Sequence, residues 1–235
     1  MKKVVGIVLV SVFIGFSGYG QTSIPKVGVS FSSLKADEFV AQMSNKFKSQ
    51  TGYSLGVGYD IPLKLNGNGL LSIQPEISYV QKGFKVDAEG AFYFNEAYYT
   101  INSHQEYSIR YLEFPILAKY EIGPDNFRFS FSAGPSVAFG LGERYKSVAT
   151  QTDDVETTEF INTKGDIKFF QSKDPNDASF DHNIDFGLQI GAGVSLYNRI
   201  AVDVRYGNSF TNVNEYNESK NRVVQFTVGI PIILK

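Results

Sequence analysis

The sequence predicts an all-β fold: an eight-stranded antiparallel up-and-down barrel that crosses a membrane. Three observations predict it. Eight stretches alternate large apolar residues with small or polar ones, which is the two-residue period of a strand with two different faces. Short and long connections between these stretches alternate strictly. The small and polar face suits the narrow interior of an eight-stranded barrel, which side chains fill.

Each predicted strand has its own ladder of apolar residues. In the fifth, Phe127, Phe129 and Phe131 alternate with Arg128, Ser130 and Ser132. In chain order, the strands and the residues that begin their apolar ladders are 26–33 with Val27, 51–62 with Tyr53, 70–82 with Leu71, 108–122 with Leu112, 127–142 with Phe127, 183–197 with Ile184, 199–207 with Ile200, and 222–234 with Val224.

The connections predict which end of the barrel faces which compartment. Three links are tight and consist of turn-forming residues: KLNGNG after the second strand, GPDN after the fourth, and YNR after the sixth. The links 34–50, 83–107, 143–182 and 208–221 are long. Short turns at one end and long ones at the other are typical of an outer-membrane barrel with periplasmic turns and surface loops.

The two faces of the strands predict the surroundings of the barrel. Long apolar ladders would be an aggregation hazard in water, whereas in hydrocarbon they match the solvent. The apolar face is therefore expected to contact outer-membrane lipid. A soluble lipocalin-like ligand-binding barrel is the alternative, and it would place its large apolar side chains around an internal ligand.

The N-terminus predicts export. Lys2 and Lys3 precede an apolar run from Val4 to Phe16 that is too short to span a bilayer, and small residues follow up to Gly20. We expect a signal peptide at 1–20 and one outer-membrane barrel domain at 21–235. The net charge of −2 without a basic stripe argues against nucleic acid as a partner, and the absence of cysteine excludes disulfides and thiolate sites.

Five segments together resemble the PorT-like outer-membrane β-barrel family: IQPEISYVQKGF (73–84), YLEFPILAKYEIG (111–123), FSAGPSVAFGLG (131–142), DFGLQIGAGVSL (185–196) and VDVRYGNSFTNV (202–213). The resemblance implies an eight-stranded barrel in the outer membrane of a Gram-negative bacterium. It implies no single activity, although the founding member is associated with protein secretion.

Two groups of residues are candidate sites. One is a set of charged residues on the inward face, interpreted as a structural network that fills the lumen, with a gate as the alternative. The other is an aromatic run within 91–99, interpreted either as a strand extension or as a surface contact. The inward set is Glu76, Glu113, Lys119, Arg128, Asp185, Asp203 and Arg205, and the aromatic set is Phe92, Tyr93, Phe94, Tyr98 and Tyr99.

Catalysis and metal binding have weaker support. The two histidines have a serine or an aspartate next to them in sequence (Ser103 and His104, Asp181 and His182), but neighbouring residues of a strand point in opposite directions. No cofactor or metal is expected. The sequence therefore predicts a non-enzymatic envelope protein with a structural or interaction role, which the barrel-assembly machinery inserts and which an envelope or secretion protein could bind. A small-solute pore is the main alternative.

Overall fold

The computed structural model describes most of the chain after residue 20. The signal peptide predicted at 1–20 lies outside the described residues. Within the described residues, no helix is long and apolar enough to cross a membrane. The described ranges are 21–35, 46–63, 69–94, 97–124, 126–153, 156–169, 178–180, 182–214 and 217–234.

The described secondary structure is almost entirely β-strand, as the alternation predicts. In chain order the strands are β1 (Thr22–Lys35), β2 (Lys46–Leu63), β3 (Gly69–Phe94), β4 (Ala97–Ile122), β5 (Phe127–Thr152), β6 (Thr157–Phe169), β7 (Ala178–Phe180), β8 (Ile184–Leu196), β9 (Ile200–Asn214), β10 (Asn217–Gly229) and β11 (Ile232–Ile233).

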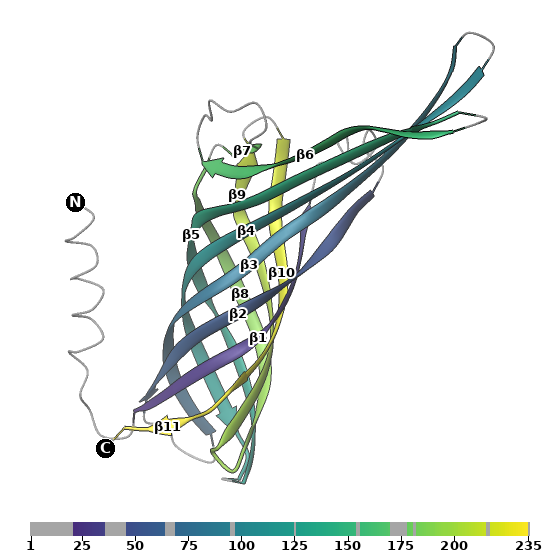
Figure 1. The fold of residues 1–235 in the computed structure, drawn as a ribbon. Coiled ribbons are helices and arrows are strands. Elements are labelled where there is room, and N and C mark those ends of the chain that lie inside the picture. The colour runs from purple at the N-terminus through teal and green to yellow at the C-terminus, as the bar shows by residue number, and fades with distance from the viewer. Residues whose placement is uncertain are drawn as a thin grey trace.

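Eight of these strands close into an antiparallel barrel, so the predicted fold class is confirmed. Their order is β4-β3-β2-β1-β10-β9-β8-β5, and pairing between β4 and β5 closes the ring. Closure gives every strand two neighbours, which satisfies the backbone hydrogen bonds without an open edge. The eight strands surround one axis in Figure 1, and β11 pairs with β1 at the lower end.

The strand ends that the short links join lie together at the lower end of the barrel in Figure 1. The β8–β9 turn places both Tyr197 and Asn198 at φ 51°, and the amide of Arg199 donates to the carbonyl of Leu196 at 2.9 Å. Positive φ at both central residues is the hairpin geometry that matches the twist of paired strands. The turn end and the long-connection end are thus separated as predicted.

The prolines within strands interrupt the ladder without changing its register. Pairing of β4 with β5 stops at Pro115–Ser136 and resumes at Ala118–Ala133 on the same register, with Pro135 in the gap. The β3–β4 ladder has a similar gap opposite Pro115, between Pro75–Ile116 and Ser78–Glu113. Proline lacks the N–H that the ladder needs, so the barrel loses local hydrogen bonds but keeps its alternation.

The long connections differ from the expected surface loops. The predicted loop 83–107 is mostly a hairpin, because β3 continues to Phe94 and β4 begins at Ala97. The predicted loop 143–182 contains the end of β5, the strand β6 and the short β7. These extensions leave the barrel wall as a sheet, which we call the protruding sheet, and it leans to one side of the barrel mouth (Figure 1).

Two glycines lie where the protruding sheet separates from the barrel. Up to Phe139, β5 pairs with β8, and from residue 143 it pairs with β6 instead. A bulge opposite Arg110 and Tyr111 accompanies this exchange, and Gly142 there has φ +80°, which L side chains rarely adopt. A side chain at Gly140 would collide with the ring of Phe169, so glycine lets the end of β6 lie over the barrel mouth.

The outward face of the barrel is apolar around its circumference. Phe129, Phe131, Ile190 and Phe226 are each about half exposed, and similar side chains occupy the other strands. The inward face instead carries buried Ser, Gln, Glu and Lys side chains. A soluble ligand-binding barrel would have the opposite arrangement.

Candidate functional site

The middle of the lumen holds a buried ionic cluster around Glu76. Arg205 of β9 binds its carboxylate with two nitrogens, at 2.7 and 3.0 Å. Lys26 of β1 binds the same carboxylate at 2.7 Å and approaches Asp203 at 3.5 Å. Gln74 adds an amide hydrogen bond at 2.5 Å. Side chains from three strands far apart in sequence therefore meet on the barrel axis.

A second cluster lies nearer to the long-connection end. Lys82 of β3 binds Glu113 of β4 at 2.7 Å and lies 3.9 Å from Asp185 of β8. Asp185 accepts a hydrogen bond from Ser209. The ammonium group of Lys82 also lies 5.0 Å from the centre of the Tyr111 ring. The cavity among these groups measures about 10 Å³, which is close to the least that one water molecule needs.

A third cluster lies at the turn end, where the lumen is wider. Lys119 binds Asp60 at 2.7 Å and Glu121 at 2.8 Å, and Arg128 lies 4.0 Å from Glu121. These residues and Asp203 line a cavity of about 150 Å³. The turn end therefore has a small polar vestibule beneath a filled centre.

All seven sequence-predicted inward charges lie in these clusters. Five are buried, namely Glu76, Glu113, Lys119, Asp185 and Arg205, whereas Arg128 and Asp203 are partly exposed in the vestibule. Sequence reasoning missed four more members. Each lies an even number of residues from an inward-facing residue of its strand, so the same two-residue alternation predicts that it points inward. They are Lys26, Asp60, Lys82 and Glu121.

An apolar cluster lies above the charges, at the mouth of the barrel. Phe84, Ile109, Tyr111, Ala138 and Ile167 are each at most 5% exposed and contact one another. Ile167 belongs to β6, which lies across the mouth in Figure 1. Phe84 also belongs to a row of rings on four neighbouring strands, with centroids 4.5 to 6.3 Å apart: Phe47, Phe84, Tyr107 and Tyr145. The sequence analysis placed Ile109, Tyr111 and Ala138 in strands and Phe84 and Ile167 in loops, and it did not predict that these residues meet.

The outer face of the protruding sheet is charged. Lys48 binds Asp87 and Lys85 binds Glu106, both at 2.5 Å. His104 contacts both carboxylates with its two ring nitrogens. Hydrogen bonds from Lys48 and His104 lower the pKa of Asp87, and the hydrogen bond from Lys85 lowers that of Glu106.

His104 therefore belongs to an ion-pair row, and Ser103, its neighbour in sequence, points to the opposite face of the strand. Among the described residues, no group of three histidine, aspartate or glutamate side chains could hold a metal ion.

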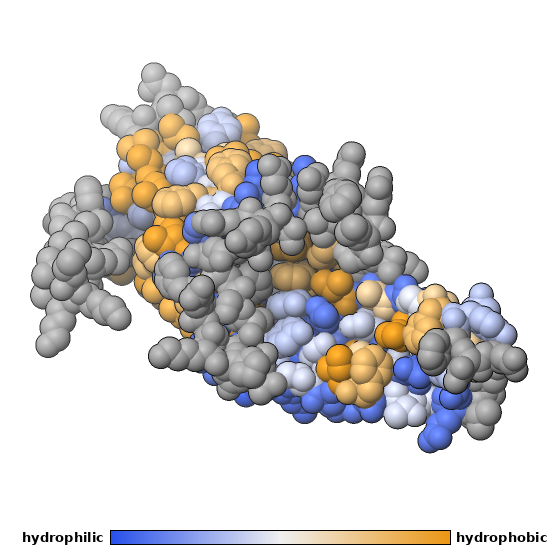
Figure 2. Space-filling view, turned by 90° about the horizontal axis from the view of Figure 1, so that it is seen from above, coloured by the Kyte–Doolittle hydropathy of each residue, from blue (hydrophilic) through white to orange (hydrophobic). Residues whose placement is uncertain are grey.

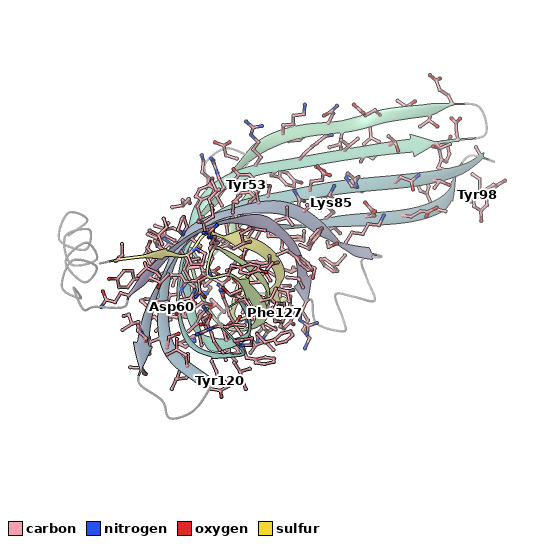
Figure 3. All side chains as sticks on the ribbon, turned by 90° about the horizontal axis from the view of Figure 1, so that it is seen from below. Tyr53, Asp60, Lys85, Tyr98, Tyr120 and Phe127 are labelled. Carbon is pink, nitrogen blue, oxygen red and sulfur yellow. The ribbon has the colours of Figure 1, made fainter. Side chains whose placement is uncertain are left out.

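The tip of the protruding sheet carries the predicted aromatic side chains. Phe92 stacks on Tyr99 with centroids 5.3 Å apart, and Tyr93 lies 5.6 Å from Tyr98. Tyr93 and Tyr98 are 64% and 61% exposed. The backbone of Phe94 lies in β3, but its side chain is outside the described part of the structure. Figure 3 shows Tyr98 at the far end of the sheet and Lys85 nearer to the barrel, while Asp60 belongs to the barrel itself.

Comparisons with known proteins agree with this architecture. The family described as outer membrane protein beta-barrel domain matches residues 10–215. No curated protein sequence matches the chain significantly.

Three solved structures are similar in fold. The Yersinia pestis attachment invasion locus protein Ail has 12% identity and a TM-score of 0.37, covering 92% of this chain and 100% of its own. The outer membrane enzyme PagL has 19% identity and a TM-score of 0.45, with coverages of 87% and 99%. Neisserial surface protein A has 8% identity and a TM-score of 0.36, with coverages of 90% and 98%.

Proposed function

The chain belongs to the outer membrane protein beta-barrel domain family, and on that premise we propose that it is a non-enzymatic interaction protein with a closed lumen. The barrel would anchor the protruding sheet in the outer membrane, and the aromatic tip would bind a protein of the envelope. One observation carries the proposal. The most exposed rings of the protruding sheet lie at its far end, where they contribute nothing to the packing of the barrel.

The aromatic tip has the chemistry of a protein contact. Tyrosine and phenylalanine supply large, rigid contact area, and they are enriched at protein interfaces. Their cross-strand pairs also stabilise the hairpin, because facing aromatic residues on paired strands attract one another. Figure 2 shows orange hydrophobic side chains among blue hydrophilic ones on the sheet as seen from above. A stable hairpin and a binding surface are compatible uses of the same rings.

The lumen supports an anchoring role more than a conducting one. The ionic clusters leave about 10 Å³ of free space among Lys82, Glu113 and Asp185, and the apolar cluster covers the mouth above them. A small-solute pore would need these buried ion pairs to open, and each broken pair would leave a charge in a dry interior. We therefore assign the inward charges a structural role.

The partners remain part of the proposal. Insertion would require the barrel-assembly machinery, as for other outer-membrane barrels, and the signal peptide at 1–20 would direct export. The motifs that resemble PorT-like barrels favour a secretion component as the partner at the tip. The protein itself would supply position and contact surface, not chemistry.

Site-specific photo-crosslinking in intact cells tests the proposal. A photoreactive residue at position 98 should give a discrete protein adduct, and the same residue at position 159, on the other hairpin of the protruding sheet, should not. Replacing Tyr93 by threonine in the position-98 protein should abolish the adduct, since threonine keeps strand propensity but removes a ring. Absence of an adduct at position 98, or the same adduct at position 159, would refute the assignment.

A further inference from the structure

Six cations lie on the outward face of the barrel directly above its apolar band. On one side, Lys35 of β1 follows Phe31, and Arg222 and Lys220 of β10 precede Val224 with the same outward parity. On the other side, Arg144 and Lys146 of β5 follow Leu141, with Lys164 next to them on β6. We call these six residues the rim cations. They occupy the end of the barrel opposite the tight turns.

The register pairs like charges within both groups. Lys146 lies directly opposite Lys164, and Lys35 lies directly opposite Lys220. Facing side chains on paired strands are about 5 Å apart at Cβ, and like charges there destabilise the sheet. None of these four lysines forms an ion pair or a side-chain hydrogen bond with another described residue. The neighbouring Glu106 of β4 already binds Lys85 at 2.5 Å.

Arg222 adds a separate observation of the same kind. Its Nε atom is buried and has no hydrogen-bond partner among the described residues. A guanidinium group binds phosphate well because its donors match two oxygens at once. Carboxylates lie opposite two of the rim cations, Asp166 opposite Arg144 and Glu106 opposite Lys146. Among the described residues, however, the four rim lysines form no ion pair, and Arg222 Nε has no hydrogen-bond partner.

We propose that the rim cations bind phosphate groups of lipid in the outer leaflet of the membrane. The ligand is inferred from the position of the rim cations. On β1, β5 and β10 the cations lie about two to five residues from an outward apolar residue, a rise of roughly 7–17 Å, and Lys164 of β6 lies opposite Lys146. A molecule that contacts both must combine acyl chains with an anionic headgroup above them. Phosphorylated glycolipid has that structure, whereas a free anion would gain nothing from the apolar band.

The expected strength follows from the number of charges. A basic residue near an anionic lipid surface contributes about 1 kcal/mol, which is about a five-fold change in affinity. Replacing both lysines of one pair should therefore weaken binding by about 25-fold. The loss should shrink as salt concentration rises, because exposed charges are screened.

Native mass spectrometry of the purified barrel in neutral detergent, titrated with bis-phosphorylated lipid A, tests the proposal. The double variant K146Q/K164Q should bind about 25-fold more weakly than the unsubstituted protein. The charge-conserving K146R/K164R should retain binding, and R199Q, which removes an exposed cation at the turn end, should not change it. A folded band on an unheated gel confirms that each variant forms its barrel.

Three results would overturn the proposal. They are equal lipid A affinity for K146Q/K164Q and the unsubstituted protein, equal affinity for dephosphorylated lipid A, and displacement of lipid A by an equal concentration of inorganic phosphate. The salt series on the unsubstituted protein is a second measurement that needs no variant, and affinity independent of salt would also overturn the proposal.

Discussion

The substitution E76Q gives the sharpest test of a dry, filled lumen. It removes the negative charge that Arg205 and Lys26 share but keeps the shape of the side chain. Breaking a buried ion pair by removing one charge costs about 3–5 kcal/mol, because the other charge stays buried without a partner. The amide oxygen of glutamine can still accept one hydrogen bond, and Lys26 keeps Asp203 at 3.5 Å.

We therefore expect the lower end of that range, a loss of about 3 kcal/mol in the free energy of unfolding. This loss lowers the ratio of folded to unfolded protein by roughly 150-fold. With a denaturant dependence of about 2 kcal/mol per molar urea, the unfolding midpoint should fall by about 1.5 M. The fraction of heat-modifiable folded band after urea equilibration in detergent micelles measures it.

The double variant E76Q/R205M separates pairing from simple damage. It removes both main partners, so no unpaired guanidinium remains, and its midpoint should recover by at least 1 M relative to E76Q, a gain of about 2 kcal/mol. The exposed Glu159 on β6 supplies the matched control, because E159Q makes the same chemical change outside the lumen and should stay within about 0.5 kcal/mol. A midpoint for E76Q within 0.5 M of the unsubstituted protein would mean that water screens Glu76, and the filled lumen would be refuted.

Three further predictions concern the lumen, the charged row and the departure of the protruding sheet. In planar bilayers the protein should show no steady openings, and large stable conductance would contradict the filled lumen. Asp87 and Glu106 have lowered pKa values in the folded hairpin, so their charged forms stabilise it at pH values above their ordinary pKa values of 3.8 and 4.5. This stabilisation is lost as the pH falls through the lowered pKa values. Amide exchange in the β3–β4 extension should therefore quicken below about pH 4 relative to the barrel, and unchanged protection at pH 2 would count against these pairs. G142A should destabilise the protruding part of β5 and β6 by about 1 kcal/mol, because φ +80° is unfavourable for alanine. Residues 143–169 should then be proteolysed faster while the barrel stays intact, and equal proteolysis rates would contradict this.

The barrel was predictable because its two faces differ in every membrane-crossing strand. Phe127, Phe129 and Phe131 point outward, and Ser130 and Ser136 are buried inside, as the alternation predicts. The alternation also places Lys82 and Glu121 on the inward face; both lie within the predicted strands 70–82 and 108–122, but the sequence analysis did not include them in the inward set. The partners of each charge were not predictable, because pairing depends on the stagger of strands that are distant in sequence.

The protruding sheet was missed for a different physical reason. Its strands keep the two-residue alternation over much of their length, but with the opposite chemistry: Phe84 and Val86 point inward, whereas Lys85 and Asp87 point outward. A search for apolar ladders that face lipid stops where that inversion occurs. The polar residues of 83–107 and 143–182 were accordingly interpreted as loops, although the two-residue period continues through much of them.

This inversion also shows at which residues of the strands the membrane ends. On β4 the outward side chain is apolar at Leu112 and charged at Arg110, two residues nearer to the protruding sheet. Over the same stretch the inward side chain changes from the charged Glu113 to the apolar Ile109. Below the boundary the exterior must be apolar and the interior can be charged, while above it water requires the reverse. Cations on the outward face just above that level therefore lie in the headgroup region. Lys35, Lys146, Lys164 and Lys220 form no ion pair with another described residue, as expected if the anions that neutralise them belong to the membrane. The rim cations and the inversion therefore both mark the level of the membrane surface.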